Sequence, residues 1–271
     1  MPTPVIVLIC LIGAAALLFA VALILAAPNK KRDYSKFYGK EYAHRGLHGN
    51  GIPENSLAAF AAARAAGYGV ELDVQLTADG KIVVFHDDTL ERMCGDDVKI
   101  KNLTLQQLQQ YRLADTDERI PLFTQVLQTL VDMPVICEIK MQDCNLSTEL
   151  CEGVCREIAD YRGDLCVESF SPYVVKWFRK NRPDIVRGQL SCSFCNDRGI
   201  KHFAMRHLLV NCMGRPDFIA YGFEDLTPWG FRLNKGLFKA FTVAWTARGD
   251  EQRKAAAKDF DTVIFEQNPP Q

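Results

Sequence analysis

VELDVQLTADGKIVVFHDD, the segment Val70–Asp88, has the pattern of two strands joined by a tight turn. Glu71 and Asp73 stand two residues apart in its first apolar run. Side chains of a strand alternate between its two faces, so both carboxylates are expected on one face and Leu72 and Val74 on the other. Two hard oxygen ligands on one face suit a divalent cation.

The turn and the returning strand predict a register for this hairpin. Asp79-Gly80 favours a two-residue type I′ turn, and Ile82–Phe85 supplies the second strand. In that register Asp73 faces His86, which places an acid/base group beside the carboxylates. The opposite face is then apolar and contains Leu72, Val74, Leu76, Val83 and Phe85.

The composition is that of a globular protein with a large core, because 48% of the 271 residues are hydrophobic and 24% are charged. The net charge of -1 gives no electrostatic reason to expect a nucleic-acid partner.

The N-terminal run Val5–Ala27 has no charged residue and, as a helix, is long enough to cross a hydrocarbon core of ~30 Å. A cleaved signal peptide is the alternative, but Met1–Pro4 lacks basic residues and the apolar run is longer than usual for a signal peptide. We therefore predict a retained single-pass helix in the cell membrane. Lys30–Arg32 follows the span, which by the positive-inside rule places the rest of the chain in the cytoplasm. Cys137 and Cys166, in apolar strand-like runs, fit such a reducing compartment.

The predicted organisation is a transmembrane anchor over residues 5–27, a basic linker over 28–40 and one catalytic domain over 41–271. Strands are expected at Tyr42–Arg45, Val70–Leu76, Lys81–His86, Pro134–Lys140, Leu165–Ser169, Ile185–Leu190, Asp217–Tyr221, Phe241–Trp245 and Asp261–Phe265. Helices are expected at Asn55–Ala66, Leu103–Leu113, Thr124–Val131, Thr148–Tyr161, Pro172–Lys180, Ile200–Leu209 and Glu251–Lys258.

This alternation of strands and helices predicts the fold class. If Lys81–His86 is the return arm of the hairpin, eight strands remain, mostly separated by helices, and such strands pair in parallel. The number and the length match a (β/α)₈ TIM-type barrel. A doubly wound open sheet is the alternative, but no G-x-G-x-x-G follows an early strand.

Other polar residues fall at the carboxyl ends of strands, the face of a barrel where catalysis takes place. The first strand ends in His44-Arg45, and the planar guanidinium of Arg45 suits phosphate or carboxylate. Glu138 and Lys140 share one face of an apolar strand and could simply form an ion pair. Yet Glu71, Asp73 and Glu138 in one barrel mouth would repel one another without Mg²⁺ or Ca²⁺ between them. The sequence therefore predicts one divalent cation here.

The segment Pro53-Glu54-Asn55-Ser56 precedes a predicted helix. Asn55 is expected to be the N-cap of this helix. Glu54 suits a surface position and a position in the site equally well.

Six motifs of this chain together resemble the glycerophosphodiester phosphodiesterase family, in a membrane-anchored bacterial form. They are H-R-G from His44, P-E-N-S-L-A-A-F from Pro53, the hairpin from Glu71, C-E-I-K from Cys137, F-S-P from Phe170 and A-W-T from Ala244. The resemblance implies a TIM-type barrel and metal-dependent hydrolysis of a glycerophosphodiester to glycerol 3-phosphate and an alcohol. By motif, Glu71, Asp73 and Glu138 match the metal ligands, His44 and His86 the general acid/base pair, and Arg45 and Lys140 the phosphate contacts.

Near its C-terminus the chain departs from the family's pattern. Where the family resembles W-T-V-N and G-I-I-T-D-x-P, this chain has Trp245-Thr246-Ala247-Arg248 and Val263-Ile264-Phe265-Glu266-Gln267-Asn268-Pro269. We interpret this departure as a matter of head-group preference rather than of catalysis.

Two other functions fit the same residues. One is a lysophospholipase D-like enzyme, or one that forms a cyclic phosphate, acting on membrane lysolipids. The other is an inactive, membrane-tethered binding module, although such a module would have no need for all seven polar side chains. The nucleophile is either water or the glycerol 2-hydroxyl.

Two further patterns are given no catalytic role. Cys192, Cys195, His202 and His207 have a spacing that superficially resembles a zinc site, but 202–207 is typical of an amphipathic helix. The aromatic segment Gly222–Lys239 is interpreted as core packing or a lid helix, with a lipid-facing lip of the barrel as the less favoured alternative.

Overall fold

Eight parallel strands close into a barrel in the computed structural model, which describes residues 3–29, 33–141, 148–194 and 199–267. Neighbouring strands hydrogen-bond in the order β1-β11-β10-β9-β8-β7-β6-β2, and the pairing of β1 with β2 closes the ring. The strands are β1 (Glu41–His44), β2 (Gly69–Leu76), β6 (Val135–Ile139), β7 (Leu165–Ser169), β8 (Val186–Ser191), β9 (Phe218–Gly222), β10 (Phe241–Arg248) and β11 (Thr262–Glu266). The predicted TIM-type barrel is confirmed.

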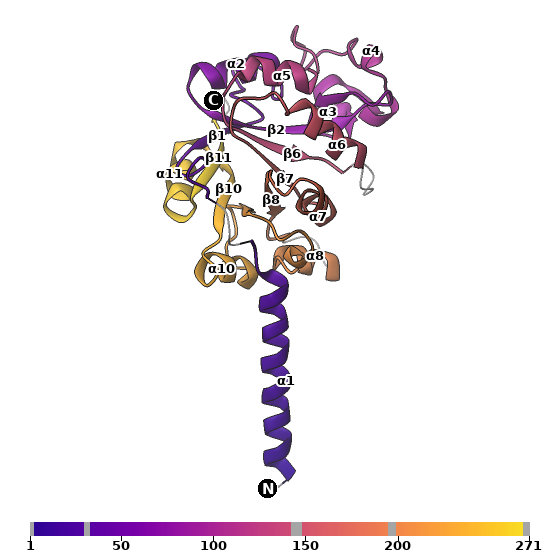
Figure 1. The fold of residues 1–271 in the computed structure, drawn as a ribbon. Helices are drawn as coiled ribbons and strands as arrows, with labels where there is room; N and C mark the ends of the chain where they lie inside the picture. Colours follow the sequence, from indigo (N-terminus) through magenta and orange to yellow (C-terminus); the bar gives the residue numbers. More distant parts are fainter. Residues whose placement is uncertain (1–2, 30–32, 142–147, 195–198, 268–271) are drawn as a thin grey trace.

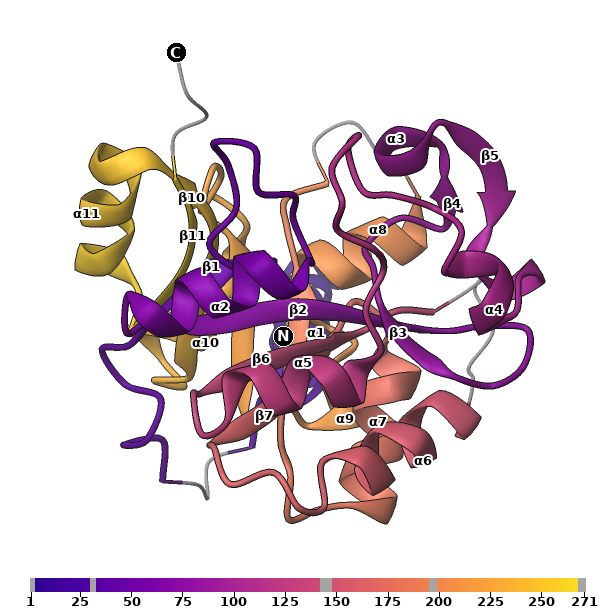
Figure 2. The same cartoon turned by 90° about the horizontal axis from the view of Figure 1, so that it is seen from above.

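Helices surround the strands on the outside of the barrel (Figure 2). They are α2 (Leu57–Ala65), α5 (Phe123–Leu130), α6 (Thr148–Glu157), α7 (Pro172–Asn181), α8 (Ile200–Arg206), α9 (Asn211–Gly214), α10 (Trp229–Gly236) and α11 (Gly249–Asp259). The apolar faces of these helices and the outward residues of the strands form the main core. Ser56, not the predicted Asn55, caps α2, because its side chain accepts a hydrogen bond from the Ala59 amide.

Residues that point into the barrel are apolar at the amino end and polar at the carboxyl end. Tyr42, Ile136, Cys166 and Ile264 belong to a buried apolar cluster in the interior. Two residues further along the same strands, and therefore on the same face, come His44, Glu138, Glu168 and Glu266. The barrel thus stacks a polar layer on an apolar layer, and the site occupies the polar layer.

The hairpin after β2 differs by one residue from the predicted register. β2 pairs with β3 (Ile82–Val84) so that Val74 lies opposite Val84. The Gly80 amide donates to the Thr77 carbonyl and the Thr77 amide to the Lys81 carbonyl, which leaves a three-residue loop. Of the predicted turn pair only Gly80 has a positive φ, 69°, so the type I′ turn is wrong.

The shift changes which residues share a face. Ile82 and Val84, rather than Val83 and Phe85, join Leu72, Val74 and Leu76 in the main core. Asp73 accepts a backbone hydrogen bond from Phe85, at 2.9 Å, and does not face His86 within the sheet. His86 instead follows the end of β3 and reaches the site from the loop.

An inserted segment follows this hairpin at the carboxyl end of the barrel. It contains β4 (Thr89–Leu90), α3 (Glu91–Cys94), β5 (Asp96–Lys99), a 3₁₀ turn (Ile100–Asn102) and α4 (Leu105–Leu108). The predicted helix Leu103–Leu113 is therefore wrong in extent. Thr104 caps α4 in a capping box with Gln107, and a small separate core that includes Leu90, Ile100 and Leu108 replaces the continuous helical face.

The N-terminal helix α1 (Thr3–Ala26) extends away from the barrel (Figure 1). Its segment Pro4–Ala26 has a mean hydropathy of 3.1 and is long and apolar enough to cross a membrane. The basic residues 30–32 that follow lie outside the described part of the chain. Phe37, from the stretch predicted to be a linker, is buried in the apolar interior at the amino end of the barrel.

The last carbonyl groups of α1 are hydrogen-bonded to residues of α9 and its C-cap. The Asn211 side chain donates to the Ala26 carbonyl at 2.8 Å. The Arg215 guanidinium donates to the carbonyls of Ile24, at 2.8 Å, and Ala27, at 2.7 Å. Because these carbonyls have no partner within the helix itself, the contacts cap α1 and fix it to the barrel.

Gly188 tests the packing of the interior. A Cβ at this position in β8 would lie 2.2 Å from the ring of Phe218, which is itself buried. We expect Gly188→Ala to lower the free energy of unfolding by about 1–3 kcal/mol through overpacking. Gly236→Ala is the control, because a Cβ there meets nothing within 4 Å. Chemical unfolding in detergent measures both, and equal midpoints for the two variants would contradict this packing.

Candidate active site

The predicted site residues converge at the carboxyl end of the barrel. Six of them, together with Glu168 and an apolar wall, line one cavity of about 50 Å³. These six are His44, Arg45, Glu71, His86, Glu138 and Lys140. The seventh, Asp73, contacts the cavity through ion pairs to Lys140 and Arg45.

The register of the parallel strands brings the carboxylates together. Asp73 of β2 lies beside Glu138 of β6, which lies beside Glu168 of β7. Glu71 lies beside His44 of β1. Ligand oxygens of Glu71, Asp73 and Glu138 all lie within 4.8 Å of one another. All three residues are buried, so their mutual repulsion is weakly screened.

Two positively charged side chains, Lys140 and Arg45, offset part of this negative charge. Lys140 Nζ lies 2.9 Å from Asp73 Oδ1 and 2.8 Å from Glu138 Oε1, and Arg45 Nε lies 3.4 Å from Asp73 Oδ2. Burial alone would raise the pKa of Asp73, but the charges of Lys140 and Arg45 outweigh it and lower the pKa. The predicted ion pair of Glu138 and Lys140 and the predicted acidic cluster are therefore parts of one arrangement.

The carboxyl groups of Glu71 and Glu168 are less compensated by positive charge than that of Asp73. Burial and then repulsion by neighbouring carboxylates raise the pKa of both groups well above its usual range. Glu168 Oε2 is buried without a hydrogen-bond partner. The sequence analysis missed Glu168, although its position two residues after Cys166 in an apolar strand was a usable signal.

The cluster fits a divalent cation. Its carboxylate oxygens are the ligands that Mg²⁺ and Ca²⁺ prefer, and the cost of burying them falls when such an ion lies among them. A further buried oxygen, on Glu168, has no partner and lies in the same cavity wall.

His44 is held by a residue that the sequence analysis did not assign to the site. Its Nδ1 lies 2.6 Å from Glu266 Oε1, and its Nε2 lies 3.8 Å from Glu71 Oε2. Burial, although opposed by Glu266, lowers the pKa of His44. With Glu266 as acceptor, Nδ1 carries the proton of the neutral ring, and Nε2 is left as a base.

Glu266 is paired in turn with Arg248, whose Nε lies 3.1 Å from Glu266 Oε2. Burial would raise the pKa of Glu266, but the hydrogen bond from His44 and the nearby positive charges lower it to about 2. Both residues belong to the segments that depart from the family's pattern. The departure thus includes a direct contact to His44 as well as any effect on head-group preference.

The loop that carries His86 is held by Gln75 of β2, and the His86 ring is held by the neighbouring Asp87. The Gln75 amide nitrogen lies 2.9, 3.2 and 2.8 Å from the carbonyl oxygens of Phe85, His86 and Asp87. His86 Nδ1 lies 2.5 Å from Asp87 Oδ1. Burial lowers the pKa of His86, while the charge of Asp73 opposes this effect.

Glu54 and Asn55 also belong to the site. Glu54 Oε1 accepts from Arg45 at 2.7 Å and from Arg92 at 2.6 Å, and Arg92 also donates to Asp87. Asn55, predicted to be a helix cap, donates to Asp73 Oδ2 at 2.9 Å. The first loop of the barrel therefore orients both Arg45 and a predicted metal ligand.

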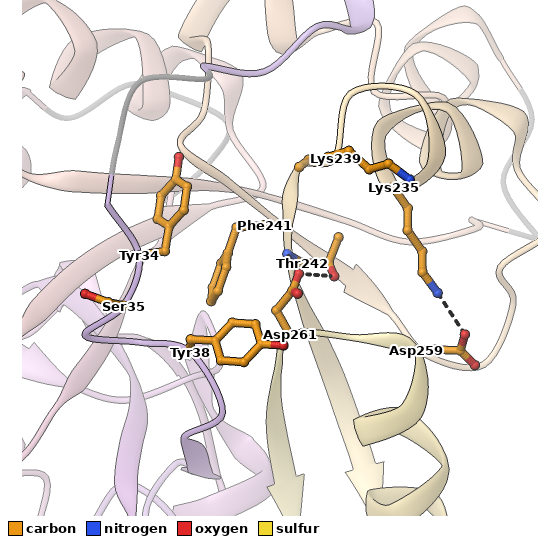
Figure 3. Close-up of a pocket in the computed structure, with 10 residues that line it drawn as sticks. Tyr34, Ser35, Tyr38, Lys235, Lys239, Phe241, Thr242, Asp259 and Asp261 are labelled. Atoms are coloured by element: carbon orange, nitrogen blue, oxygen red, sulfur yellow. Dashed lines mark hydrogen bonds and ion pairs between the residues drawn. The ribbon is translucent and has the colours of Figure 1, made fainter.

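A larger cavity, of about 430 Å³, lies at the opposite end of the strands, where β10 and β11 begin (Figure 3). Tyr34, Tyr38 and Phe241 form its aromatic side. Lys235 donates to Asp259 at 2.8 Å across its rim. It is remote from the acidic cluster, so cavity size does not identify the catalytic site.

A buried acidic cluster with two histidines at the mouth of a TIM-type barrel can bind a divalent cation and transfer protons beside it. A sequence profile for the glycerophosphoryl diester phosphodiesterase family matches residues 44–194. A glycerophosphodiester phosphodiesterase of Caldanaerobacter subterraneus is 32% identical over 158 residues, which is 55% of this chain and 65% of that protein. A putative glycerophosphodiester phosphodiesterase of Bacillus subtilis is 31% identical over 196 residues, which is 64% of this chain and 80% of that protein.

Two solved structures share the fold. A glycerophosphodiester phosphodiesterase from Thermotoga maritima has a TM-score of 0.64 at 29% identity, over 83% of this chain and 93% of that one. A phosphodiesterase from Oleispira antarctica, in complex with the product sn-glycerol-3-phosphate, has a TM-score of 0.69 at 22% identity, over 84% of this chain and 93% of that one. The chain belongs to the glycerophosphoryl diester phosphodiesterase family. The predicted resemblance and the enzyme class are confirmed.

Glu266 provides a test of how His44 is held. Removing its carboxylate in Glu266→Ala leaves Nδ1 of His44 without its acceptor, so we expect kcat for glycerophosphocholine to fall by about 10–100-fold. Glu266→Gln is the control, because its amide oxygen still accepts from Nδ1, and it should lose less. Steady-state kinetics measure both variants, and wild-type kcat in Glu266→Ala would contradict the assignment.

Proposed function

We propose that the protein hydrolyses glycerophosphodiesters to glycerol 3-phosphate and an alcohol, with one Mg²⁺ or Ca²⁺ held by Glu71, Asp73 and Glu138. The observation that carries this proposal is the acidic cluster lying in one cavity with His44 and His86. Family membership supports it, as does the product that the Oleispira antarctica enzyme binds.

The chain's own groups divide the chemistry between them. Lys140 and Arg45 line the cavity and can donate to the non-bridging oxygens of the phosphate. A cation bound by the three carboxylates would add Lewis-acid stabilisation of the same oxygens. His44, with Nε2 free to accept, is the base that takes the proton of the attacking water or glycerol 2-hydroxyl. His86 is the acid that protonates the departing alkoxide, with Asp87 orienting its ring.

A lysophospholipase D-like activity is the second candidate. The chain is 32% identical over 139 residues to human lysophospholipase D GDPD1, which is 46% of this chain and 44% of that protein. Phe170, Leu190 and Trp245 form an apolar wall of the catalytic cavity, suited to a lipid tail. Phosphorus NMR of the products would separate direct hydrolysis from formation of a cyclic phosphate. An inactive binding module remains less favoured, since all seven polar side chains are present at the site.

We also propose that α1 is a retained membrane anchor with the barrel on the cytoplasmic side. Cleavage of α1 as a signal peptide would remove the carbonyl groups to which Asn211 and Arg215 donate. Asn211 is fully buried, so loss of this partner would cost free energy. The cytoplasmic orientation depends on the basic residues Lys30–Arg32 after the span.

The two histidines are tested separately. His44→Ala and His86→Ala should each lower kcat for glycerophosphocholine by roughly 10²–10⁴, because each removes a proton-transfer group. Circular dichroism should show an unchanged fold. A variant with full turnover would exclude that residue from proton transfer.

The metal site is tested through the dependence of activity on cation concentration. Chelation should abolish hydrolysis, and Mg²⁺ or Ca²⁺ should restore it. Glu71→Gln should raise the cation concentration needed for half-maximal activity by about 10-fold or more, because a charged ligand is lost. The exposed Glu91→Gln is the control and should behave as wild type. An unchanged cation titration in Glu71→Gln would remove Glu71 from the ligand set.

A further inference from the structure

Three apolar side chains are exposed on the neighbouring helices α8 and α10. Ile200 is 90% exposed and Phe203 49% on α8, and Trp229, the first residue of α10, is 39% exposed. The His207 ring lies between two of them, 4.5 Å from the Phe203 ring and stacked 4.7 Å from the Trp229 ring. We call Ile200, Phe203 and Trp229 the α8–α10 surface. Exposed apolar groups that gather in one region mark an interaction site more often than scattered ones do.

The two helices that carry this surface lie where α1 meets the barrel. Figures 1 and 2 show the end of α1 between α8 and α10. α9, which follows α8, holds the last turn of α1 through Asn211, and its C-cap Arg215 does the same. α10 is packed at backbone distance on the end of α8, because a Cβ on Gly230 would lie 2.0 Å from the His207 carbonyl oxygen. A bilayer crossed by α1 would therefore lie against the α8–α10 surface.

The charge around the surface suits an anionic lipid headgroup. Residues 199–215 and 228–240 contain no Asp or Glu. Their basic residues are Lys201, Arg206, Arg215, Arg232, Lys235 and Lys239. Lys235 is paired with Asp259, which lies outside these segments. Aromatic and aliphatic groups flanked by Lys and Arg are typical of protein surfaces that sit in the headgroup region.

A row of aromatic rings extends from the catalytic cavity to α8, the helix that carries Ile200 and Phe203. Trp245 and Phe170, which line the cavity, have ring centroids 5.5 Å apart. Phe170 lies 6.4 Å from Phe194, and Phe194 lies 5.5 Å from His202 of α8. These ring contacts form an aromatic path between α8 and the wall of the catalytic cavity.

We propose that the α8–α10 surface is a lipid-contact surface, which sits in the headgroup region of the bilayer beside α1 and admits lipid-borne phosphodiesters along the aromatic path. The contact itself requires α1 to span the bilayer. The delivery of a substrate rests in addition on the proposed function.

The contact is tested by the fluorescence of Trp229. The full chain is reconstituted into vesicles of equal parts phosphatidylcholine and phosphatidylglycerol, with bromine on the acyl chains near the headgroup. Bromine should quench part of the tryptophan fluorescence, and Trp229→Phe should remove the quenched part. Trp177→Phe, at a partly buried position on α7, is the matched control and should keep it. Equal quenching in wild type and Trp229→Phe would overturn the lipid contact.

The delivery of substrate is tested by placing a negatively charged side chain on the α8–α10 surface. Phe203→Glu should lower the hydrolysis of lysophosphatidylcholine in these vesicles by about tenfold, an effect of ~1.4 kcal/mol. Hydrolysis of water-soluble glycerophosphocholine should not change. Val131→Glu is the control, since Val131 is 45% exposed and is the C-cap of α5, a helix on the side of the barrel opposite α1 (Figure 1).

The outcomes separate the two proposals. Undiminished hydrolysis of vesicle lysophosphatidylcholine by Phe203→Glu would overturn the delivery role. If the wild type hydrolyses neither substrate, the proposed function fails, and the quenching of Trp229 still decides whether the surface contacts lipid.

Discussion

The structure depends on the cost of burying negative charge at the mouth of the barrel. Glu71, Asp73, Glu138 and Glu168 come from three neighbouring strands and are all buried. Lys140 contacts two of them. Such an arrangement is unfavourable for an isolated fold, because buried carboxylates need a partner charge or a proton. The fold tolerates this arrangement through the ion pairs around Asp73 and through raised pKa values at the other carboxylates. The same uncompensated carboxylates are the groups that can bind a metal cation.

The parallel barrel explains why the charges gather there. Every strand points the same way, so residues that follow the apolar layer on each strand reach one end together. The first loop then adds Arg45 and Asn55, which contact Asp73, and Glu54, which pairs with Arg45. Loop and strand contributions are thus separate. The strands determine where the carboxylates lie, and the loops determine which positively charged and amide side chains contact them.

The sequence was sufficient for the barrel and for most of the site. Alternating apolar residues identify the eight strands, and inward polar residues at strand ends identify the cavity. The hairpin register failed because the type of a short turn depends on whether Asp79 takes a positive φ, which its neighbours in the sequence do not determine. Glu168 and Glu266 were missed for another reason: their roles follow from residues that are adjacent only once the barrel has closed.

The capped end of α1 has a consequence for how such a protein would meet its substrate. A helix held by three side-chain hydrogen bonds at its junction cannot swivel freely, so the barrel and the helix turn as one body. If α1 spans a bilayer, the mouth of the barrel keeps a constant distance from the lipid surface and a constant orientation to it. For a substrate carried in the bilayer, encounter then becomes a search in two dimensions, in which the number of substrate molecules per unit of membrane area sets the turnover instead of their concentration in bulk solution.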